Sequence, residues 1–152
     1  MRTCDFLVIG GGVIGLSIAR ELKTRHADAR ILLIEKESAC GAHASGRNSG
    51  VLHAGFYYSP DSLKAKFTKL GNERMTAYCE QKGIPLNRCG KLVVAKDAGD
   101  LPSLDELVKR GRANAIEIQE LTEAEAKRIE PRVKTYQRAL FSPRTSTVNP
   151  LH

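Results

Sequence analysis

The chain opens with an apolar segment and a glycine turn, Phe6-Leu7-Val8-Ile9-Gly10-Gly11-Gly12-Val13-Ile14-Gly15. A helical run to about Lys23 and a second apolar segment, Ile31-Leu32-Leu33-Ile34, come next, and Glu35 ends that segment. This order predicts a strand, a glycine turn, a helix and a second strand in a βαβ unit. In that context a Gly-x-Gly-x-x-Gly sequence indicates dinucleotide binding, with a purely structural glycine turn as the alternative.

The three motif glycines have different expected roles. Gly10 allows the tight turn out of the first strand, and Gly12, which has no Cβ, lets a pyrophosphate approach the backbone. Gly15 lets the helix pack closely on the strands. The first helical turn, which holds Val13 and Ile14, has free N–H groups and the positive end of the helix dipole. We therefore expect a diphosphate to be stabilised there.

The acidic residue after the second strand narrows the choice of dinucleotide. Glu35 lies 20 residues after Gly15, and a carboxylate at that place can accept hydrogen bonds from the adenosine ribose. Because it is acidic rather than an arginine, we expect no 2′-phosphate and hence no NADP. The motif by itself does not separate NAD from FAD.

Length and composition indicate a globular class. The 152 residues are enough for one domain with a hydrophobic core. Hydrophobic residues make up 41% and charged residues 27%, as in ordinary globular proteins. No apolar run approaches the ~20 residues that span a bilayer. The short segment Phe6–Ile9, followed by a glycine turn, does not match a signal peptide.

The formal net charge is +7, from 24 Lys and Arg against 17 Asp and Glu. The basic residues are scattered and aromatic residues are only 5%, so we expect no nucleic-acid partner. Solvated helix faces account for the charge, with an anionic cofactor, an anionic substrate or a membrane surface as alternatives. We expect a cytoplasmic protein and leave open a peripheral contact with the inner face of a membrane.

The cysteines show no metal-binding or disulfide pattern. They are Cys4, Cys40, Cys79 and Cys89. None forms a Cys-x-x-Cys pair, and the four histidines are not spaced as ligands with them. We expect free thiols in a reducing compartment and no metal site.

Residues 37–56 are rich in small residues and form the second informative stretch. Such a segment suits close contact with a ligand, since its backbone N–H groups and its Ser and Asn side chains become donors. Arg47 adds a permanent cation whose planar fork suits phosphate. A flexible surface loop is the alternative.

The rest of the chain predicts mixed helices and strands. We expect a helix over 60–83 that Ser59 or Asp61 caps, with Pro60 in its first turn and Gly83 at its end. Its apolar stripe is expected to be core, and consists of Leu63, Phe67, Leu70 and Tyr78. Helices are also expected over 100–114 and from a capping box at 122–125, and strands over 90–96, 115–119 and 139–141. Residues 142–152 hold no expected terminating element.

Together, the turn at 10–15, Glu35-Lys36 and the run Ser45-Gly46-Arg47-Asn48-Ser49-Gly50-Val51-Leu52-His53-Ala54-Gly55 resemble the FAD-dependent D-amino-acid-oxidase superfamily. Within it, the run Phe56-Tyr57-Tyr58-Ser59-Pro60-Asp61-Ser62-Leu63-Lys64-Ala65-Lys66-Phe67 is similar to L-2-hydroxyglutarate oxidases and dehydrogenases. Gly90–Ala95 fits the same family, and the likeness covers nearly the whole chain. At 144–150 the chain lacks a glycine and an aspartate that the family usually carries.

The resemblance implies FAD as the cofactor, Glu35 on the adenosine ribose, residues 45–49 beside the pyrophosphate and flavin, and His53 near the isoalloxazine. The cofactor-binding residues it implies, together with the motif, are Gly10, Gly12, Val13, Ile14, Gly15, Glu35, Lys36, Ser45, Arg47, Asn48, Ser49 and His53. For His53 a polar contact with the flavin, a structural role and covalent attachment stay open.

The resemblance also implies oxidation of a small 2-hydroxy acid to the 2-oxo acid, with hydride transfer to flavin N5. His53 is the candidate base in the matched motifs, although the base can also lie outside this chain. The electron acceptor is not predicted.

The implied fold is α/β, a Rossmann-like FAD-binding portion at 1–84 followed by the start of an α+β substrate domain at 85–152. Family members run well over twice this length, so we expect an N-terminal portion that is inactive alone and whose exposed sheet edges favour self-association. The alternatives are a non-catalytic dinucleotide-binding fragment that needs a partner chain, and a superfamily member acting on an amine, amino acid or glycerol phosphate.

Overall fold

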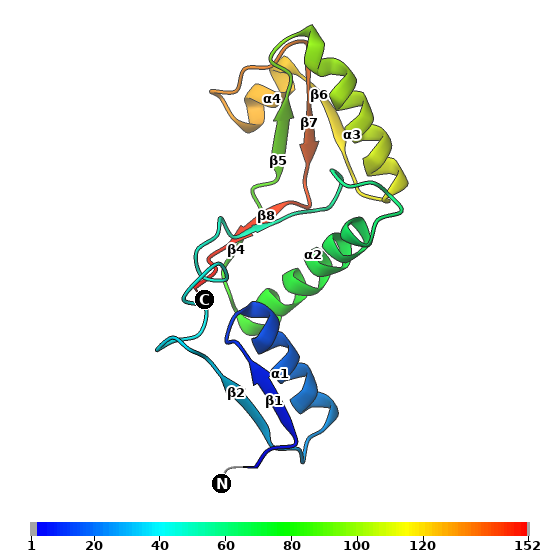
Figure 1. Cartoon of the computed structure of the whole chain (residues 1–152). Helices are drawn as coiled ribbons and strands as arrows, with labels where there is room; N and C mark the ends of the chain where they lie inside the picture. The colour runs from blue at the N-terminus through cyan, green and yellow to red at the C-terminus, as the bar shows by residue number, and fades with distance from the viewer. Residues whose placement is uncertain (1–2, 152) are drawn as a thin grey trace. The chain divides into compact units, whose positions relative to one another are not determined.

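The structure is a computed structural model that describes residues 3–151 (Figure 1). The chain forms two compact units, residues 1–49 with 150–152 and residues 50–149. Helices and strands are mixed along the chain, and the predicted α/β class is confirmed. The boundary expected after residue 84 concerns the domains of the family and stays a prediction.

The first unit is the predicted βαβ unit. Its elements are β1 (Phe6–Ile9), α1 (Val13–Arg25) and β2 (Ile31–Ile34). Strands β1 and β2 are parallel, and their register runs from Phe6 opposite Ile31 to Ile9 opposite Ile34. A parallel pair needs a crossover, and α1 supplies it.

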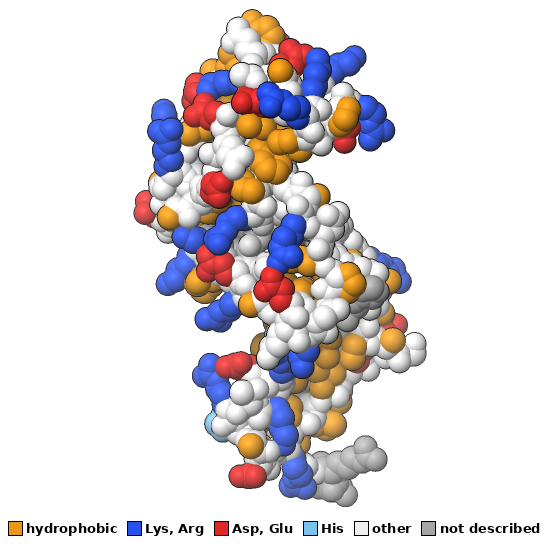
Figure 2. Space-filling view, turned by 180° about the vertical axis from the view of Figure 1, so that it is seen from behind, with side chains coloured by type: hydrophobic (Ala, Val, Ile, Leu, Met, Phe, Trp, Pro, Cys, Tyr) orange, Lys and Arg blue, Asp and Glu red, His pale blue; other side chains and the backbone are white. Residues whose placement is uncertain are grey.

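Few side chains of the first unit are buried. Among its described residues Val8, at 8% exposure, is the one buried hydrophobic side chain. The large hydrophobic side chains that remain exposed are Leu7, Ile9, Val13, Ile14, Leu16, Ile18, Ile34 and Leu151. Hydrophobic side chains are visible at the surface in Figure 2. The unit therefore holds its shape with little core of its own.

The second unit contains two antiparallel sheets. The first has the strand order β3-β8-β4, and the second has the order β5-β7-β6. The strands are β3 (Val51–Leu52), β4 (Leu86–Asn87), β5 (Lys91–Val94), β6 (Gln119–Thr122), β7 (Arg138–Ser142) and β8 (Ser146–Val148). The helices are α2 (Leu63–Lys82), α3 (Leu101–Ala113) and α4 (Glu123–Ile129), and a 3-10 turn at Ala98–Asp100 precedes α3.

Two hydrophobic clusters form the core of the second unit. In the first cluster Leu104 and Val108 of α3 pack on Leu140 of β7 and on Ala95. The second cluster consists of Ala54, Phe56 and Ile116. Val93, Leu107 and Ile118 are partly buried and pack against both clusters. The segment at 54–56 is thus anchored in the core of this unit.

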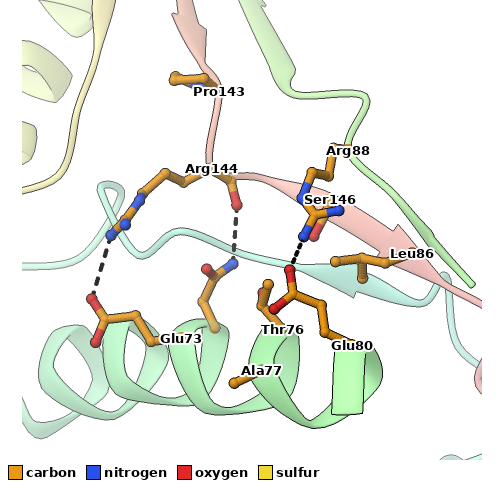
Figure 3. Close-up of a pocket in the computed structure, with 10 residues that line it drawn as sticks. Glu73, Thr76, Ala77, Glu80, Leu86, Arg88, Pro143, Arg144 and Ser146 are labelled. Atoms are coloured by element: carbon orange, nitrogen blue, oxygen red, sulfur yellow. Dashed lines mark hydrogen bonds and ion pairs between the residues drawn. The ribbon is translucent and has the colours of Figure 1, made fainter. Parts of the chain in front are cut away.

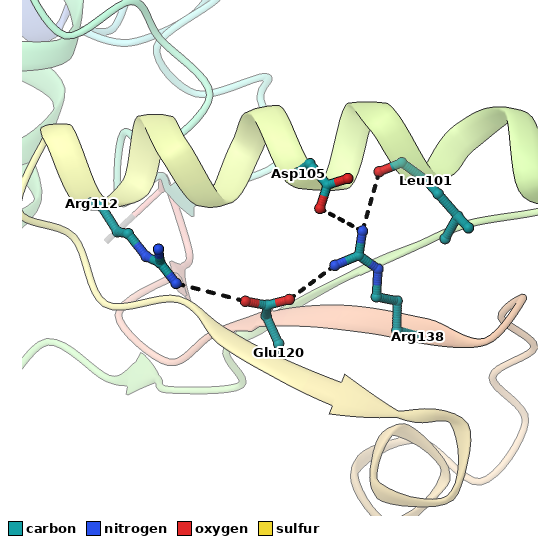
Figure 4. Close-up of polar contacts among 5 residues, drawn as sticks. All are labelled: Leu101, Asp105, Arg112, Glu120 and Arg138. Carbon is teal, nitrogen blue, oxygen red and sulfur yellow. Dashed lines mark hydrogen bonds and ion pairs between the residues drawn. The ribbon is translucent and has the colours of Figure 1, made fainter.

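Salt bridges at the edge of the core join α3 to the second sheet (Figure 4). Arg138 on β7 pairs with Asp105 at 2.6 Å and with Glu120 at 2.9 Å, and it donates to the Leu101 carbonyl at 3.5 Å. Arg112 lies 3.9 Å from the other oxygen of Glu120. Because several charges share one network, these contacts fix α3 on the sheet better than an isolated surface pair would.

Helix α2 differs from its prediction at its start and in its buried face. Ser62 caps it, since its Oγ accepts the Ala65 N–H at 3.1 Å, so the cap expected at Ser59 or Asp61 is wrong. Gly83 ends it as predicted, with φ at 64°. The stripe expected to be core is largely exposed, with Leu63 at 68% and Phe67 at 61%. The buried residues of α2 are instead Ala65 and Cys79, on a face that the rest of the second unit covers.

Two strand predictions also need correction. The strand expected at 115–119 lies at 119–122, because the chain reverses after α3 with Ala115 at a φ of 51°. The last residues do contain an element, β8, which pairs with both β3 and β4. The predicted capping box of α4 is confirmed, with Thr122 and Glu125 bonded reciprocally.

Candidate dinucleotide site

The glycine turn has a backbone that only glycine allows. Gly10 has a φ of 104°, a region that side chains rarely adopt. A Cβ on Gly15 would lie 1.9 Å from the Gly10 carbonyl oxygen, so α1 can approach the turn this closely only without a side chain there. The roles expected for these two glycines, a tight turn and close helix packing, agree with this geometry.

The start of α1 presents N–H groups. Gly12 is the N-cap and makes no side-chain cap. The Val13 N–H donates to Ser45 Oγ at 2.9 Å. Within residues 3–151 no acceptor serves the N–H groups of Ile14 and Gly15. Two donors and the positive helix end are therefore available to a diphosphate.

Glu35 is held at the glycine turn by backbone donors. One carboxylate oxygen accepts the Glu37 N–H at 3.0 Å, and the other accepts a short hydrogen bond from the Gly11 N–H. These bonds, the one from Glu37 first, lower the pKa of Glu35 and keep it ionised. Each oxygen keeps a further lone pair, so the carboxylate can still accept ribose hydroxyls.

Residues 40–48 fold over the same turn. The Gly41 N–H donates to the Gly11 carbonyl at 3.0 Å, and Asn48 Nδ2 donates to the carbonyls of Ala44 and Ser45 at 3.0 and 2.8 Å. A Cβ on Gly46 would meet the Gly41 carbonyl oxygen at 2.4 Å. The segment is thus tied to the turn by specific contacts, which favours the ligand-contact interpretation over a free surface loop.

The structure brings some of the predicted site residues together and leaves others apart. Ser45 and Glu35 meet the glycine turn directly. Arg47 and Ser49 are exposed, and Lys36 lies 3.6 Å from Glu37 at the surface. Gly11 was missed by the sequence prediction, although it donates to Glu35 from the middle of the motif.

His53 belongs to the second unit and follows β3. The His53 side chain is exposed, but partial loss of the water around it and, as a smaller cause, the nearby charge of Lys91 lower its pKa below 6.5. The imidazole is therefore neutral at pH 7. A neutral imidazole can accept a proton, which is what the predicted role as a base requires.

The second unit also contains a cleft of about 380 Å³ between α2, β4 and the start of β8 (Figure 3). Two ion pairs line it: Arg144 lies 3.4 Å from Glu73, and Arg88 contacts Glu80. Because both arginines are neutralised, the cleft offers no unpaired charge to an anionic ligand. In residues 3–151 no group of three or more His, Cys, Asp or Glu could hold a metal ion.

A family model described as FAD dependent oxidoreductase matches residues 5–152. The chain belongs to this FAD-dependent oxidoreductase family. The resemblance inferred from the two glycine-containing motifs is thereby confirmed, and so is FAD as the family's cofactor. The donors at the start of α1 and the carboxylate of Glu35 fit its diphosphate and its ribose.

Curated relatives of this chain include L-2-hydroxyglutarate dehydrogenases. The chain is 44% identical over 145 residues to an L-2-hydroxyglutarate dehydrogenase of Escherichia coli strain K12, covering 95% of this chain and 34% of the relative. It is 44% identical over 112 residues to the mitochondrial L-2-hydroxyglutarate dehydrogenase of Homo sapiens, covering 74% of this chain and 24% of the relative. The chain thus spans about a third or less of the length of these relatives.

Solved structures agree on the fold. An L-alpha-glycerophosphate oxidase of Mycoplasma pneumoniae with FAD bound has a TM-score of 0.87 and 33% identity, covering 99% of this chain and 40% of its own. A glycine oxidase of Geobacillus kaustophilus has a TM-score of 0.83 and 28% identity, and the match covers 97% of this chain and 41% of the glycine oxidase chain. No helix formed by residues 3–151 has the length and apolar character needed to cross a membrane.

Proposed function

We propose that this chain is the FAD-binding part of an oxidoreductase that converts a 2-hydroxy acid of the L-2-hydroxyglutarate type into the 2-oxo acid. The observation that carries the proposal is the 44% identity, over 145 residues, to a relative named L-2-hydroxyglutarate dehydrogenase. The geometry of the glycine turn supports it, since that turn offers donors to a diphosphate and a carboxylate to a ribose.

The first unit would bind the adenosine and diphosphate parts of FAD. The N–H groups of Ile14 and Gly15 would donate to the diphosphate, and Ser45 would hold the Val13 end of the helix in place. Glu35, kept ionised by its backbone donors, would accept the ribose hydroxyls. The remaining predicted cofactor-binding residues are Gly10, Gly12, Lys36, Arg47, Asn48, Ser49 and His53.

His53 is the proposed base. Bound FAD supplies an acceptor for the hydride that leaves C2 of the substrate. His53, neutral at pH 7, would take the proton of the substrate hydroxyl, so that the C2 oxygen becomes a carbonyl as the hydride leaves. Its lowered pKa favours this, because the free base is the form present at neutral pH.

A turnover assay tests the proposed function. The FAD-loaded protein is mixed with L-2-hydroxyglutarate and an artificial electron acceptor, and formation of 2-oxoglutarate is measured. We expect turnover with L-2-hydroxyglutarate to exceed that with glycerol 3-phosphate or with an amino acid. Absence of 2-oxoglutarate in a preparation that contains bound flavin would contradict the proposal.

A second candidate is oxidation of an amine, an amino acid or glycerol phosphate. The favouring observations are the TM-scores of 0.87 to an L-alpha-glycerophosphate oxidase with FAD bound and of 0.83 to a glycine oxidase. The same substrate panel decides between the two. The third alternative, a non-catalytic dinucleotide-binding fragment that needs a partner chain, stays a prediction, and turnover by this chain alone would refute it.

The expected partners and location remain predictions. We expect a small 2-hydroxy acid as the substrate, an electron acceptor that is not assigned, and no nucleic-acid partner. We also expect self-association through exposed sheet edges, and a cytoplasmic location with contact at the inner face of a membrane. Sedimentation of the purified protein with and without anionic vesicles would test the last two together.

A further inference from the structure

Lys91 has a half-buried side chain with an unneutralised charge. It begins β5, directly opposite the buried Ser142 of β7. Its Nζ lies 4.7 Å from the centre of the Tyr57 ring. Among residues 3–151 no carboxylate forms a salt bridge with it. Its ammonium, held over an aromatic ring and without a carboxylate partner among these residues, has capacity for an anionic partner.

The ring beneath Lys91 is fixed in place. Tyr57 packs on the buried ring of Phe56, with ring centres 4.3 Å apart. Its carbonyl accepts a hydrogen bond from Arg110 at 2.8 Å, and the Tyr58 carbonyl accepts one from Asn114 at 3.0 Å. Two residues near the end of α3 therefore hold the segment that positions the lysine.

Lys91 also lies close enough to His53 for its charge to disfavour the imidazolium. His53, Tyr57 and Lys91 all belong to the second unit. Lys91 contacts the Tyr57 ring, and its charge acts on His53. The combination offers a neutral imidazole that can accept a proton and an ammonium that can bind an anion. A 2-hydroxy acid presents both partners, a hydroxyl and at least one carboxylate.

We propose that Lys91 is a substrate-binding residue that pairs with a carboxylate of the 2-hydroxy acid while the substrate hydroxyl faces His53. This inference rests on the proposed function, which identifies the substrate as a 2-hydroxy acid. The Tyr57 ring orients the ammonium without neutralising it, so the N–H donors of Lys91 stay available.

A neighbouring lysine provides a matched control. Lys64 lies over the Tyr58 ring at 4.5 Å, which is the same kind of contact one residue along the segment. It is exposed on the first turn of α2, and its charge is not among the causes that shift the pKa of His53. Replacing it removes an equal charge and an equal ring contact from a place where no substrate is expected.

Binding of glutarate tests the inference without turnover. Glutarate carries the two carboxylates of 2-hydroxyglutarate but no oxidisable hydroxyl. It is titrated into the FAD-loaded protein while the His53 ring signals are followed by NMR, with His53→Gln used for assignment. We expect saturable shifts, an apparent affinity about tenfold weaker in Lys91→Met, and little change in Lys64→Met.

Lys91→Arg separates binding from a structural role. It keeps the charge and the contact with an aromatic ring, so we expect it to restore most of the glutarate affinity that Lys91→Met loses. Equal affinity in Lys91→Met and the wild type, or no shift of His53 with glutarate in the wild type, would overturn the inference. If Lys91→Met and Lys91→Arg both lose glutarate affinity, the inference is also overturned, because the positive charge would then not be what binds glutarate.

Kinetics separate this inference from the proposed function. If glutarate binds through Lys91 but L-2-hydroxyglutarate is not oxidised, the proposed function fails and the anion site remains. If L-2-hydroxyglutarate is oxidised with the same KM in Lys91→Met, the inference fails and the proposed function remains.

A parallel measurement with L-2-hydroxybutyrate, which has only the carboxylate next to C2, shows which carboxylate Lys91 binds. If Lys91→Met raises the KM for both substrates equally, Lys91 binds the carboxylate next to C2. If it raises the KM for L-2-hydroxyglutarate alone, Lys91 binds the distal carboxylate.

Discussion

The first unit, residues 1–49 with 150–152, buries one hydrophobic side chain among its described residues, whereas the second, residues 50–149, buries eleven. The first is shaped by backbone: a left-handed glycine, a helix start and a carboxylate that accepts backbone N–H groups. The second is shaped by side chains packed between α3 and the sheet of β5, β7 and β6. The features proposed to bind the cofactor and the side chains that form the hydrophobic core therefore lie largely in different units of this chain.

The difference predicts that a single methyl group is worst tolerated at the glycine turn. In Gly15→Ala the new Cβ would lie 1.9 Å from the Gly10 carbonyl oxygen, and backbone cannot move aside as a flexible side chain can. We expect FAD affinity, measured by flavin fluorescence, to fall about 100-fold or more because α1 must shift away from the turn.

Gly71→Ala is the matched control for Gly15→Ala. Gly71 lies in α2 of the second unit, and a Cβ there would have no neighbour within 4 Å. We expect unchanged FAD affinity and a gain in the free energy of unfolding of up to about 1 kcal/mol, since alanine favours the helix. Wild-type FAD affinity in Gly15→Ala would show that the turn does not need its present geometry.

Removal of core side chains should affect the second unit. Leu140 on β7 is fully buried, so Leu140→Ala leaves a cavity and should lower the free energy of unfolding by about 2–5 kcal/mol. Urea unfolding measures the change. Leu63→Ala, at a side chain 68% exposed, is the control and should change it by less than about 0.5 kcal/mol. Similar effects of the two substitutions would contradict the assigned core.

Acid should weaken the first unit through Glu35. Hydrogen bonds from Glu37 and Gly11 hold its pKa below the ordinary value of 4.5. The stabilisation is therefore fully present above about pH 4.5 and is lost as the pH falls through the lowered pKa. Glu35→Gln should remove this acid-dependent part of the urea midpoint measured between pH 3 and 7. Glu21→Gln removes a carboxylate from an exposed ion pair on α1 and should leave the acid-dependent change of the urea midpoint unaltered.

The smallest expected effect concerns His53. Its pKa, measured by NMR of the imidazole, should lie below 6.5 in the folded protein, because reduced access to water and the charge of Lys91 disfavour the imidazolium. Lys91→Met removes the second cause and should raise the pKa part of the way back towards 6.5, whereas Lys64→Met should not change it. A pKa above 6.5 in the wild type would mean that an acidic group, not Lys91, dominates this place.

Local features of the chain were predictable from sequence. The strand, glycine turn, helix and strand at 6–35 follow one another directly, so a single window of sequence predicts them. The capping box at Thr122 and the end of α2 at Gly83 are also local. The resemblance to the FAD-dependent family was predicted from the glycine turn, Glu35-Lys36 and the small-residue run at 45–55, and the family model matches residues 5–152.

Non-local features were not predictable from the same windows. Helical spacing showed that α2 has an apolar stripe, but burial depends on what the rest of the chain covers, and here Ala65 and Cys79 are buried instead. Strands β3 and β4 have two residues each, too few to show alternation. The hydrogen bond from Gly11 to Glu35 joins residues 24 apart, and the contact of Lys91 with Tyr57 joins β5 to a turn between β3 and α2.

Titration of FAD into the purified chain, followed by amide hydrogen exchange, tests most directly whether the glycine turn binds the cofactor. We predict saturable binding and slowed exchange at the amides of Gly11, Ile14 and Gly15, with exchange in α3 and β7 unchanged. No saturable binding, or protection confined to the second unit, would contradict the assignment of the glycine turn as the FAD site.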